Sequence, residues 1–125
     1  VDTVPLYLWV DVAKIESAVQ NLLSNAFKYT SQNGRIELAV SEAEIDGRPY
    51  CLVTVSDNGV GIPDDLQQHV FDSFVTGKRI PQYSTSIGLG LHIVKHTMGL
   101  HHGFVTLTSR VGEGSRFVLH VRWKK

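Results

Sequence analysis

Asn21-Leu22-Leu23-Ser24-Asn25-Ala26-Phe27-Lys28-Tyr29-Thr30 is the stretch that decides the fold, because two patterns coincide in it. Its apolar residues continue a helical repeat that begins upstream, and Asp11 is placed to cap the first turn. The members of this apolar stripe are Ile15, Ala18, Val19, Leu22, Leu23 and Ala26. The stripe predicts a helix from Asp11 to about Thr30 that lays one face on a hydrophobic core.

Polar residues form a second stripe beside the apolar one. Asn21, Asn25 and Lys28 recur at i, i+4 and i+7, which places them along one side of the helix. Asparagine is unfavourable in the interior of a helix. A single asparagine there is explained by a position on the solvent-exposed face. Three aligned polar groups indicate more, because a carboxamide oxygen suits Mg²⁺ and a lysine one turn on can meet its phosphates.

The rest of the sequence alternates between short strands and helices. Strands are expected at residues 6–10, 36–40, 51–55, 104–109 and 116–123, and helices at 64–70 and 89–100. Turn-forming residues at 46–49 and 112–114 separate neighbouring strands, and residues 76–88 show no periodicity and predict a long, mobile loop. Hairpins mixed with helices predict an α+β fold. We expect a two-layer α/β sandwich with a mixed, mostly antiparallel sheet of about five strands and about three helices on one face.

Composition predicts that residues 1–125 form one domain. A chain of 125 residues with 42% hydrophobic and 19% charged residues is ordinary for a single globular core. Twelve Lys+Arg balance twelve Asp+Glu, so no net charge attracts nucleic acid or an anionic membrane. The single cysteine, Cys51, excludes a disulfide framework, and no apolar run approaches the ~18 residues of a membrane-spanning helix.

Two glycine-containing segments are candidates for binding a nucleotide. Asp57-Asn58-Gly59-Val60-Gly61-Ile62-Pro63 follows a strand, where a carboxylate can accept from an exocyclic amine such as that of adenine. Asp-Asn-Gly is also a common turn, so a purely structural role is the alternative. Gly88-Leu89-Gly90-Leu91 opens the second long helix, whose unpaired N–H groups can hold phosphate. Neither segment contains the Gly-Lys-Ser/Thr of a P-loop.

The order of these segments resembles the catalytic ATP-binding domain of sensor histidine kinases. The stretch ending at Thr30 is similar to the N-box of that family, and the segment starting at Asp57 is similar to its first glycine box. Phe71-Asp72-Ser73-Phe74 resembles the F-box, Gly88-Leu89-Gly90-Leu91 the second glycine box, and Gly112-Glu113-Gly114-Ser115-Arg116-Phe117 the closing turn. The resemblance covers residues 11–121 and implies the Bergerat fold of the GHKL superfamily.

The resemblance implies a role for each matching residue. Asn25 corresponds to the Mg²⁺ ligand, Asp57 to the acceptor of the adenine amine, and Lys28 to a phosphate contact. Asn21 stands where ATP-hydrolysing relatives carry a glutamate base. Asn21, for this position, and Lys28, for its phosphate contact, are the candidate catalytic residues. The other candidate nucleotide-binding residues are Tyr29, Gly59, Gly61, Phe71, Phe74, Lys78, Arg79, Gly88, Leu89, Gly90, Leu91 and Ser115. Gly59 and Gly61 would lie beneath the base, and Ser115 near the adenine.

An ATP lid is also implied by the resemblance. Phe71 and Phe74 would anchor it, and Lys78 or Arg79 would reach the γ-phosphate. The sequence departs from the family in three places. Thr85-Ser86-Ile87 stands where one more glycine is usual, and His101-His102-Gly103 stands where His-Gly-Gly is usual. The last strand is also not followed by the proline that is common in the family. None of these departures affects Asn25 or Asp57.

The resemblance implies a protein-histidine kinase that binds ATP with Mg²⁺ and transfers the γ-phosphate to a histidine on a separate helical dimerisation domain. None of the six histidines here has the acidic residue and proline that follow an acceptor in the family. We therefore expect the phosphoacceptor domain to lie outside residues 1–125 and the chain not to autophosphorylate alone.

The resemblance also implies a setting for the domain. We expect a response regulator as the downstream partner, and a homodimeric longer protein anchored in the bacterial inner membrane with this domain on the cytoplasmic side. The alternatives are a nucleotide-binding regulatory domain without transfer and a serine kinase of the anti-sigma-factor type.

Overall fold

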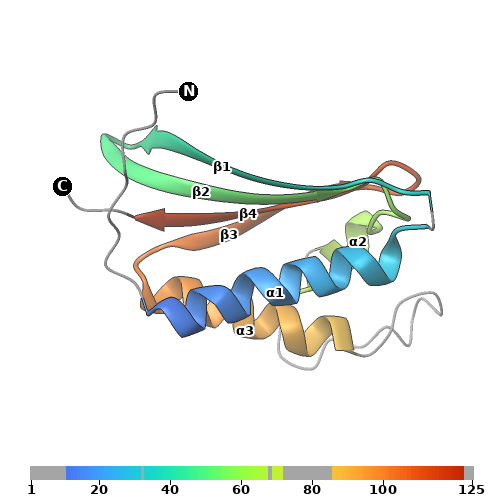
Figure 1. Cartoon of the computed structure of the whole chain (residues 1–125), viewed down its shortest axis with the longest axis horizontal. Coiled ribbons are helices and arrows are strands. Elements are labelled where there is room, and N and C mark those ends of the chain that lie inside the picture. The colour runs from blue at the N-terminus through green and yellow to red at the C-terminus, as the bar shows by residue number, and fades with distance from the viewer. Residues whose placement is uncertain (1–10, 32, 68, 72–85, 123–125) are drawn as a thin grey trace.

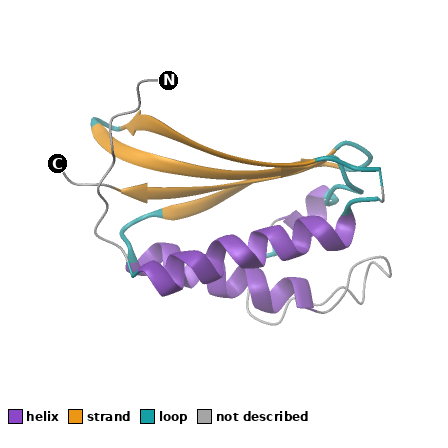
Figure 2. Ribbon diagram, viewed as in Figure 1, coloured by secondary structure: helices purple, strands orange, loops and turns teal. Residues whose placement is uncertain are grey.

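The computed structural model describes residues 11–31, 33–67, 69–71 and 86–122, and for 86–90 it describes the backbone only. These residues form a sheet and a layer of helices beneath it (Figure 1 and Figure 2). The elements in chain order are α1 (Val12–Tyr29), β1 (Ile36–Ile45), β2 (Arg48–Asp57), α2 (Asp64–Gln67), α3 (Ser86–Leu100), β3 (Phe104–Arg110) and β4 (Gly114–Arg122). The predicted α+β two-layer sandwich is thus confirmed.

The sheet of the described residues has four antiparallel strands in the order β1-β2-β4-β3. At the end nearest the loop that follows β2, Asp57 pairs with Ile36 on β1 and with Ser115 on β4. This pairing places Asp57 and Ser115 next to each other although they are far apart in sequence. The expected strand at 6–10 lies outside the described residues, so a fifth, mixed-direction strand stays a prediction.

Both long helices pack on the same face of the sheet and against each other. The apolar stripe of α1 buries Ala18, Leu22 and Ala26 almost completely, as the helical repeat predicts. Alternate residues of β2 and β4 point toward this layer, because side chains alternate between the faces of a strand. The core consists of Ala18, Leu22, Ala26, Val55, Ile62, Leu66, Val70, Leu91, Val94, Met98, Phe117, Leu119 and Val121.

The first hairpin is longer than the sequence predicts. β1 continues to Ile45, and β2 begins at Arg48, so Pro49 lies within a strand and not in the turn. A two-residue turn suffices because Asp46 and Gly47 both have positive φ, 53° and 75°, which is the geometry that matches the twist of a hairpin.

The helix boundaries agree with the prediction at α1 but not at α2 and α3. Asp11 caps α1 by accepting a hydrogen bond from the N–H of Lys14 at 3.1 Å. α2 ends at Gln67, earlier than expected, and α3 begins at Ser86, earlier than the expected residue 89. Gly88 and Gly90 therefore lie inside the first turns of α3. Among the described residues, no helix is both long enough and apolar enough to cross a membrane.

Candidate functional site

A small pocket opens where the second half of α1 meets the end of the sheet. Its walls come from α1, from the loop after β2 and from β4. The lining residues are Asn25, Ala26, Tyr29, Asp57, Val60, Gly61, Ile62, Ser115 and Phe117. The cavity measures about 20 Å³, which is room for about one water molecule, so a larger ligand would extend beyond it.

Asp57, the last residue of β2, is the acidic residue of this lining. Its Oδ1 accepts a hydrogen bond from the N–H of Gly59 at 2.8 Å. Burial raises the pKa of Asp57 above its ordinary value, and hydrogen bonds from the backbone N–H groups of Gly59 and Ser115 offset part of that rise. A half-buried carboxylate in this setting gains from a further donor, which a ligand with an amino group supplies.

Asn25 lies across the pocket from the sheet and is 7% exposed. Its Nδ2 is buried and has no hydrogen-bond partner in the part of the chain that the structure describes. Leaving such a group unpaired costs about 1–3 kcal/mol, so a ligand that completes it is the natural explanation. A carboxamide also presents an oxygen when its plane is turned over, and an oxygen is what Mg²⁺ prefers.

The structure gathers only part of the predicted set in this pocket. Asn25, Tyr29, Asp57, Gly61 and Ser115 line it. Asn21 is half-buried one turn before Asn25, and Lys28 is exposed on the following turn, both outside the lining. Phe71 also stands outside the lining, but its ring meets that of Phe117 edge-on at 6.1 Å and so supports a pocket wall. The roles of these residues toward a nucleotide stay predictions.

The glycines of the loop after β2 have a structural reason beyond ligand approach. A Cβ on Gly59 would overlap the backbone carbonyl of Tyr29, and one on Gly61, where φ is 75°, would overlap that of Arg110. The loop therefore passes so close to α1 and β3 that only glycine fits. Gly61 lines the pocket and Gly59 does not, so Gly59 beneath the base stays a prediction.

The expected lid falls largely outside the described residues. Phe74, Lys78 and Arg79 are in this part, so their predicted contacts stay predictions. Gly88, Leu89 and Gly90 lie in the first turns of α3. Of the three, only Gly88 is close enough to the helix start for its backbone N–H to lack a partner within the helix. The side chain of Leu91 is fully buried in the core, so any contact of this residue with a ligand would come from its backbone.

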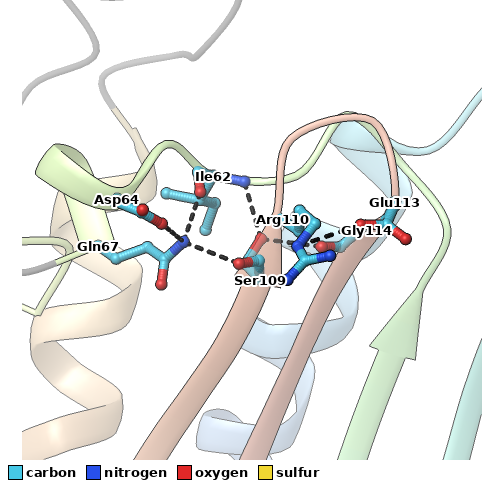
Figure 3. A network of polar contacts seen from close by, with 7 residues as sticks. All are labelled: Ile62, Asp64, Gln67, Ser109, Arg110, Glu113 and Gly114. Carbon is cyan, nitrogen blue, oxygen red and sulfur yellow. Dashed lines mark hydrogen bonds and ion pairs between the residues drawn. The ribbon is translucent and has the colours of Figure 1, made fainter.

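Sequence reasoning missed a polar network that holds the pocket wall in place (Figure 3). Gln67 donates to the carbonyl oxygens of Ile62 at 2.6 Å and Ser109 at 3.0 Å. The hydroxyl of Ser109 accepts from the N–H of Ile62 at 2.8 Å and lies 2.8 Å from Ser115 Oγ. Neither Gln67 nor Ser109 belongs to a recognisable motif, and only the pairing of β3 with β4 reveals the network.

Comparison with known proteins agrees with this geometry. Residues 10–125 match the sequence profile of the family described as histidine kinase-, DNA gyrase B- and HSP90-like ATPase. The chain is 39% identical over 109 residues to the sensor histidine kinase TmoS of Ectopseudomonas mendocina, covering 86% of this chain and 11% of TmoS. It is 32% identical over 117 residues to the sensor histidine kinase RppB of Synechocystis sp., covering 93% of this chain and 25% of RppB.

Solved structures give the same result. The catalytic domain of the histidine kinase ThkA superposes with a TM-score of 0.80 at 26% identity, covering 99% of this chain and 77% of that one. The chain thus spans a small part of the curated relatives and most of an isolated catalytic domain. The chain therefore belongs to the histidine kinase-, DNA gyrase B- and HSP90-like ATPase family, and it is a catalytic ATP-binding domain of the histidine kinase type.

Proposed function

We propose that the pocket beside α1 binds ATP with Mg²⁺, and that the domain transfers the γ-phosphate to a histidine on a helical dimerisation domain of the same protein. The observation that carries this proposal is the meeting of Asn25 and Asp57 in one pocket. Asn25 contributes a buried amide nitrogen without a partner among the described residues, and Asp57 contributes a half-buried carboxylate. These are also the residues for which the family resemblance implies binding of the cation and the base.

The residues present fit this ligand. The carboxamide of Asn25 would hold Mg²⁺, Asp57 would accept from the amino group of the base, and Lys28 would contact phosphate. Bound Mg²⁺ supplies neutralisation of the phosphate charge. Backbone N–H groups in the first turn of α3 would add hydrogen-bond donors for phosphate.

The histidine acceptor would come from outside the described residues, so this domain mainly positions the nucleotide. Asn21 carries an amide that cannot take a proton from water, which favours transfer over hydrolysis. We propose a response regulator as the next acceptor and a homodimeric longer protein, anchored in the bacterial inner membrane with this domain on the cytoplasmic side.

Calorimetric titration with ADP and ATP tests the binding site. Asn25→Ala is expected to lose the Mg²⁺ dependence of nucleotide affinity, because the oxygen that would bind the cation is removed. Gln20→Ala is the matched control, since Gln20 is exposed on the same helix. An Mg²⁺ titration unchanged by Asn25→Ala would contradict the assignment of the cation to this helix.

Transfer needs its own test. With γ-labelled ATP the chain alone should acquire no acid-labile phosphate, and label should appear on a separately added helical dimerisation domain of a histidine kinase. Transfer should rise linearly with the added domain, because the two parts are not tethered. Acid-labile phosphate on this chain without the partner would refute the proposed division of roles.

A further inference from the structure

The hydroxyl of Ser109, near the end of β3, has three polar partners and stands behind the pocket wall. Its Oγ lies 2.8 Å from the N–H of Ile62, 2.8 Å from the carbonyl oxygen of Gly114 and 2.8 Å from Ser115 Oγ. Figure 3 shows the first of these contacts, which joins the loop after β2 to β3, and the second, which lies within the β3–β4 hairpin. Ser109 itself does not line the pocket, whereas Ser115 and Ile62 do.

Counting donors and acceptors fixes the direction of each of these bonds. A serine hydroxyl has one proton and two lone pairs. A carbonyl oxygen only accepts, so Ser109 must donate its proton to Gly114, and the N–H of Ile62 fills one of its lone pairs. The contact with Ser115 can then form only if Ser115 donates to Ser109. The proton of Ser115 is therefore committed, and the remaining lone pairs of Ser115 Oγ are all that it can offer a ligand.

The backbone of Ser109 is also held in place, by the side-chain amide of Gln67. Gln67 Nε2 donates to the carbonyl oxygen of Ser109 at 3.0 Å and to that of Ile62 at 2.6 Å. A side-chain amide has only two N–H bonds, so both are used, and the 3.4 Å approach to Asp64 is a minor contact. The network resists rotation of the Ser109 hydroxyl, since each alternative orientation leaves a half-buried group unpaired.

We propose that Ser109 is a positioning residue that sets the base specificity of the pocket. By holding the proton of Ser115, it leaves a wall of Ser115 and Asp57 that offers hydrogen-bond acceptors only. Such a wall favours a purine whose edge carries an amino group and disfavours one that carries an oxo group there, because two acceptors then face each other. This inference rests on the proposed binding of ATP.

The affinities of ATP and inosine triphosphate test the inference by calorimetry. The two bases differ in the exocyclic amino or oxo group and in the neighbouring ring N1, which accepts in adenine and donates in hypoxanthine, and the inference concerns the exocyclic group. The wild type should prefer ATP. In Ser109→Ala the Ser115 hydroxyl is free to rotate and to donate to an oxo group, so the ratio of the two affinities should fall about three- to tenfold. Thr108→Ala, an exposed neighbour in the same strand, should leave the ratio unchanged. A general structural weakening cancels in the ratio, because it affects both nucleotides alike.

A double-mutant cycle separates an action through Ser115 from any other. Ser115→Ala should narrow the ratio by itself, and adding Ser109→Ala should narrow it no further. Two results would overturn the inference without affecting the proposed ATP binding. The first is an ATP-to-inosine-triphosphate affinity ratio that Ser109→Ala leaves unchanged. The second is an affinity ratio that Ser109→Ala lowers further in the Ser115→Ala background. Wild-type protein that binds neither nucleotide overturns the proposed function itself. Ser109→Cys replaces Ser109→Ala in this test if the alanine variant does not fold. A cysteine has a similar volume but forms weaker hydrogen bonds, so it should also lower the ratio of the ATP and inosine triphosphate affinities.

Discussion

Replacing Asp57 by asparagine should separate ligand binding from folding stability. A hydrogen bond to a charged group is worth about 1.5–3 kcal/mol, and the half-buried carboxylate is the acidic group that lines the pocket. Asp57→Asn keeps an Oδ1 that can accept from the N–H of Gly59, so the local turn survives. We expect ADP affinity, measured by calorimetry, to fall about ten- to 150-fold.

Asp57→Asn should raise the free energy of unfolding of the unliganded domain, although it lowers the affinity for ADP. Burial raises the pKa of Asp57 from an ordinary value of 3.8, so the folded state binds the proton more tightly than the unfolded state. The free energy of unfolding therefore decreases as the pH rises above 3.8 through the raised pKa, and the loss persists at neutral pH. Asparagine does not titrate, so Asp57→Asn should gain relative to the wild type across that range.

Urea unfolding at a series of pH values, run beside the ADP titration, tests both effects. Asp65→Asn is the control, because Asp65 is exposed and lies outside the pocket. It should change neither the affinity nor the shape of the pH profile. Equal ADP affinity in Asp57→Asn and wild type, or unfolding curves that run parallel from acid to neutral pH, would refute the reasoning.

Three further predictions concern the free energy of unfolding. His102→Gly should raise the free energy of unfolding by about 0.5–1 kcal/mol, because His102 follows α3 with a φ of 56° that disfavours side chains. Thermal unfolding of His102→Ala, which keeps the strained backbone, should show no such gain; an equal gain would locate the effect in the imidazole. Gly59→Ala should cost about 2 kcal/mol or more and weaken ADP binding, since its methyl group would overlap the carbonyl of Tyr29. Gly99→Ala, whose methyl group meets open space in α3, should instead raise the free energy of unfolding by about 0.5–1 kcal/mol. Equal destabilisation of Gly59→Ala and Gly99→Ala would show that the room available for the methyl group does not decide the effect.

Local sequence patterns were sufficient to predict α1 and the apolar face that it packs on the core. The apolar stripe, the Asp11 cap and the alignment of Asn25 with its polar neighbours all depend on residues within a few turns of each other. Local patterns did not predict the end of β1 or the start of α3. The extension of β1 to Ile45 was not predicted, because glutamate and alanine, which dominate its last residues, are uncommon in strands. The start of α3 was missed because Gly88 and Gly90 are poor helix formers.

The walls of the pocket depend on contacts between distant segments, and these were only partly predictable. Asp57 and Ser115 were each identified from a motif, but their pairing across β2 and β4 follows from the sheet topology. The positions of Gln67 and Ser109 depend on that same topology, since each bonds to residues more than 40 positions away. Such contacts leave no periodic signal in one sequence.

The chemistry of the lining explains why a domain of this kind would need a nucleophile from elsewhere. Burial raises the pKa of Asp57, two backbone N–H groups offset part of that rise, and the carboxylate is engaged with these N–H groups as a hydrogen-bond acceptor. Asn25, and Asn21 one turn before it, are amides with no proton to exchange near neutral pH. The proton of Ser115 is committed to Ser109. Apart from Asp57, whose carboxylate already accepts hydrogen bonds from the backbone, the described lining holds no carboxylate or histidine that could activate water. This supports the proposal that bound ATP would be held for an outside histidine and not hydrolysed.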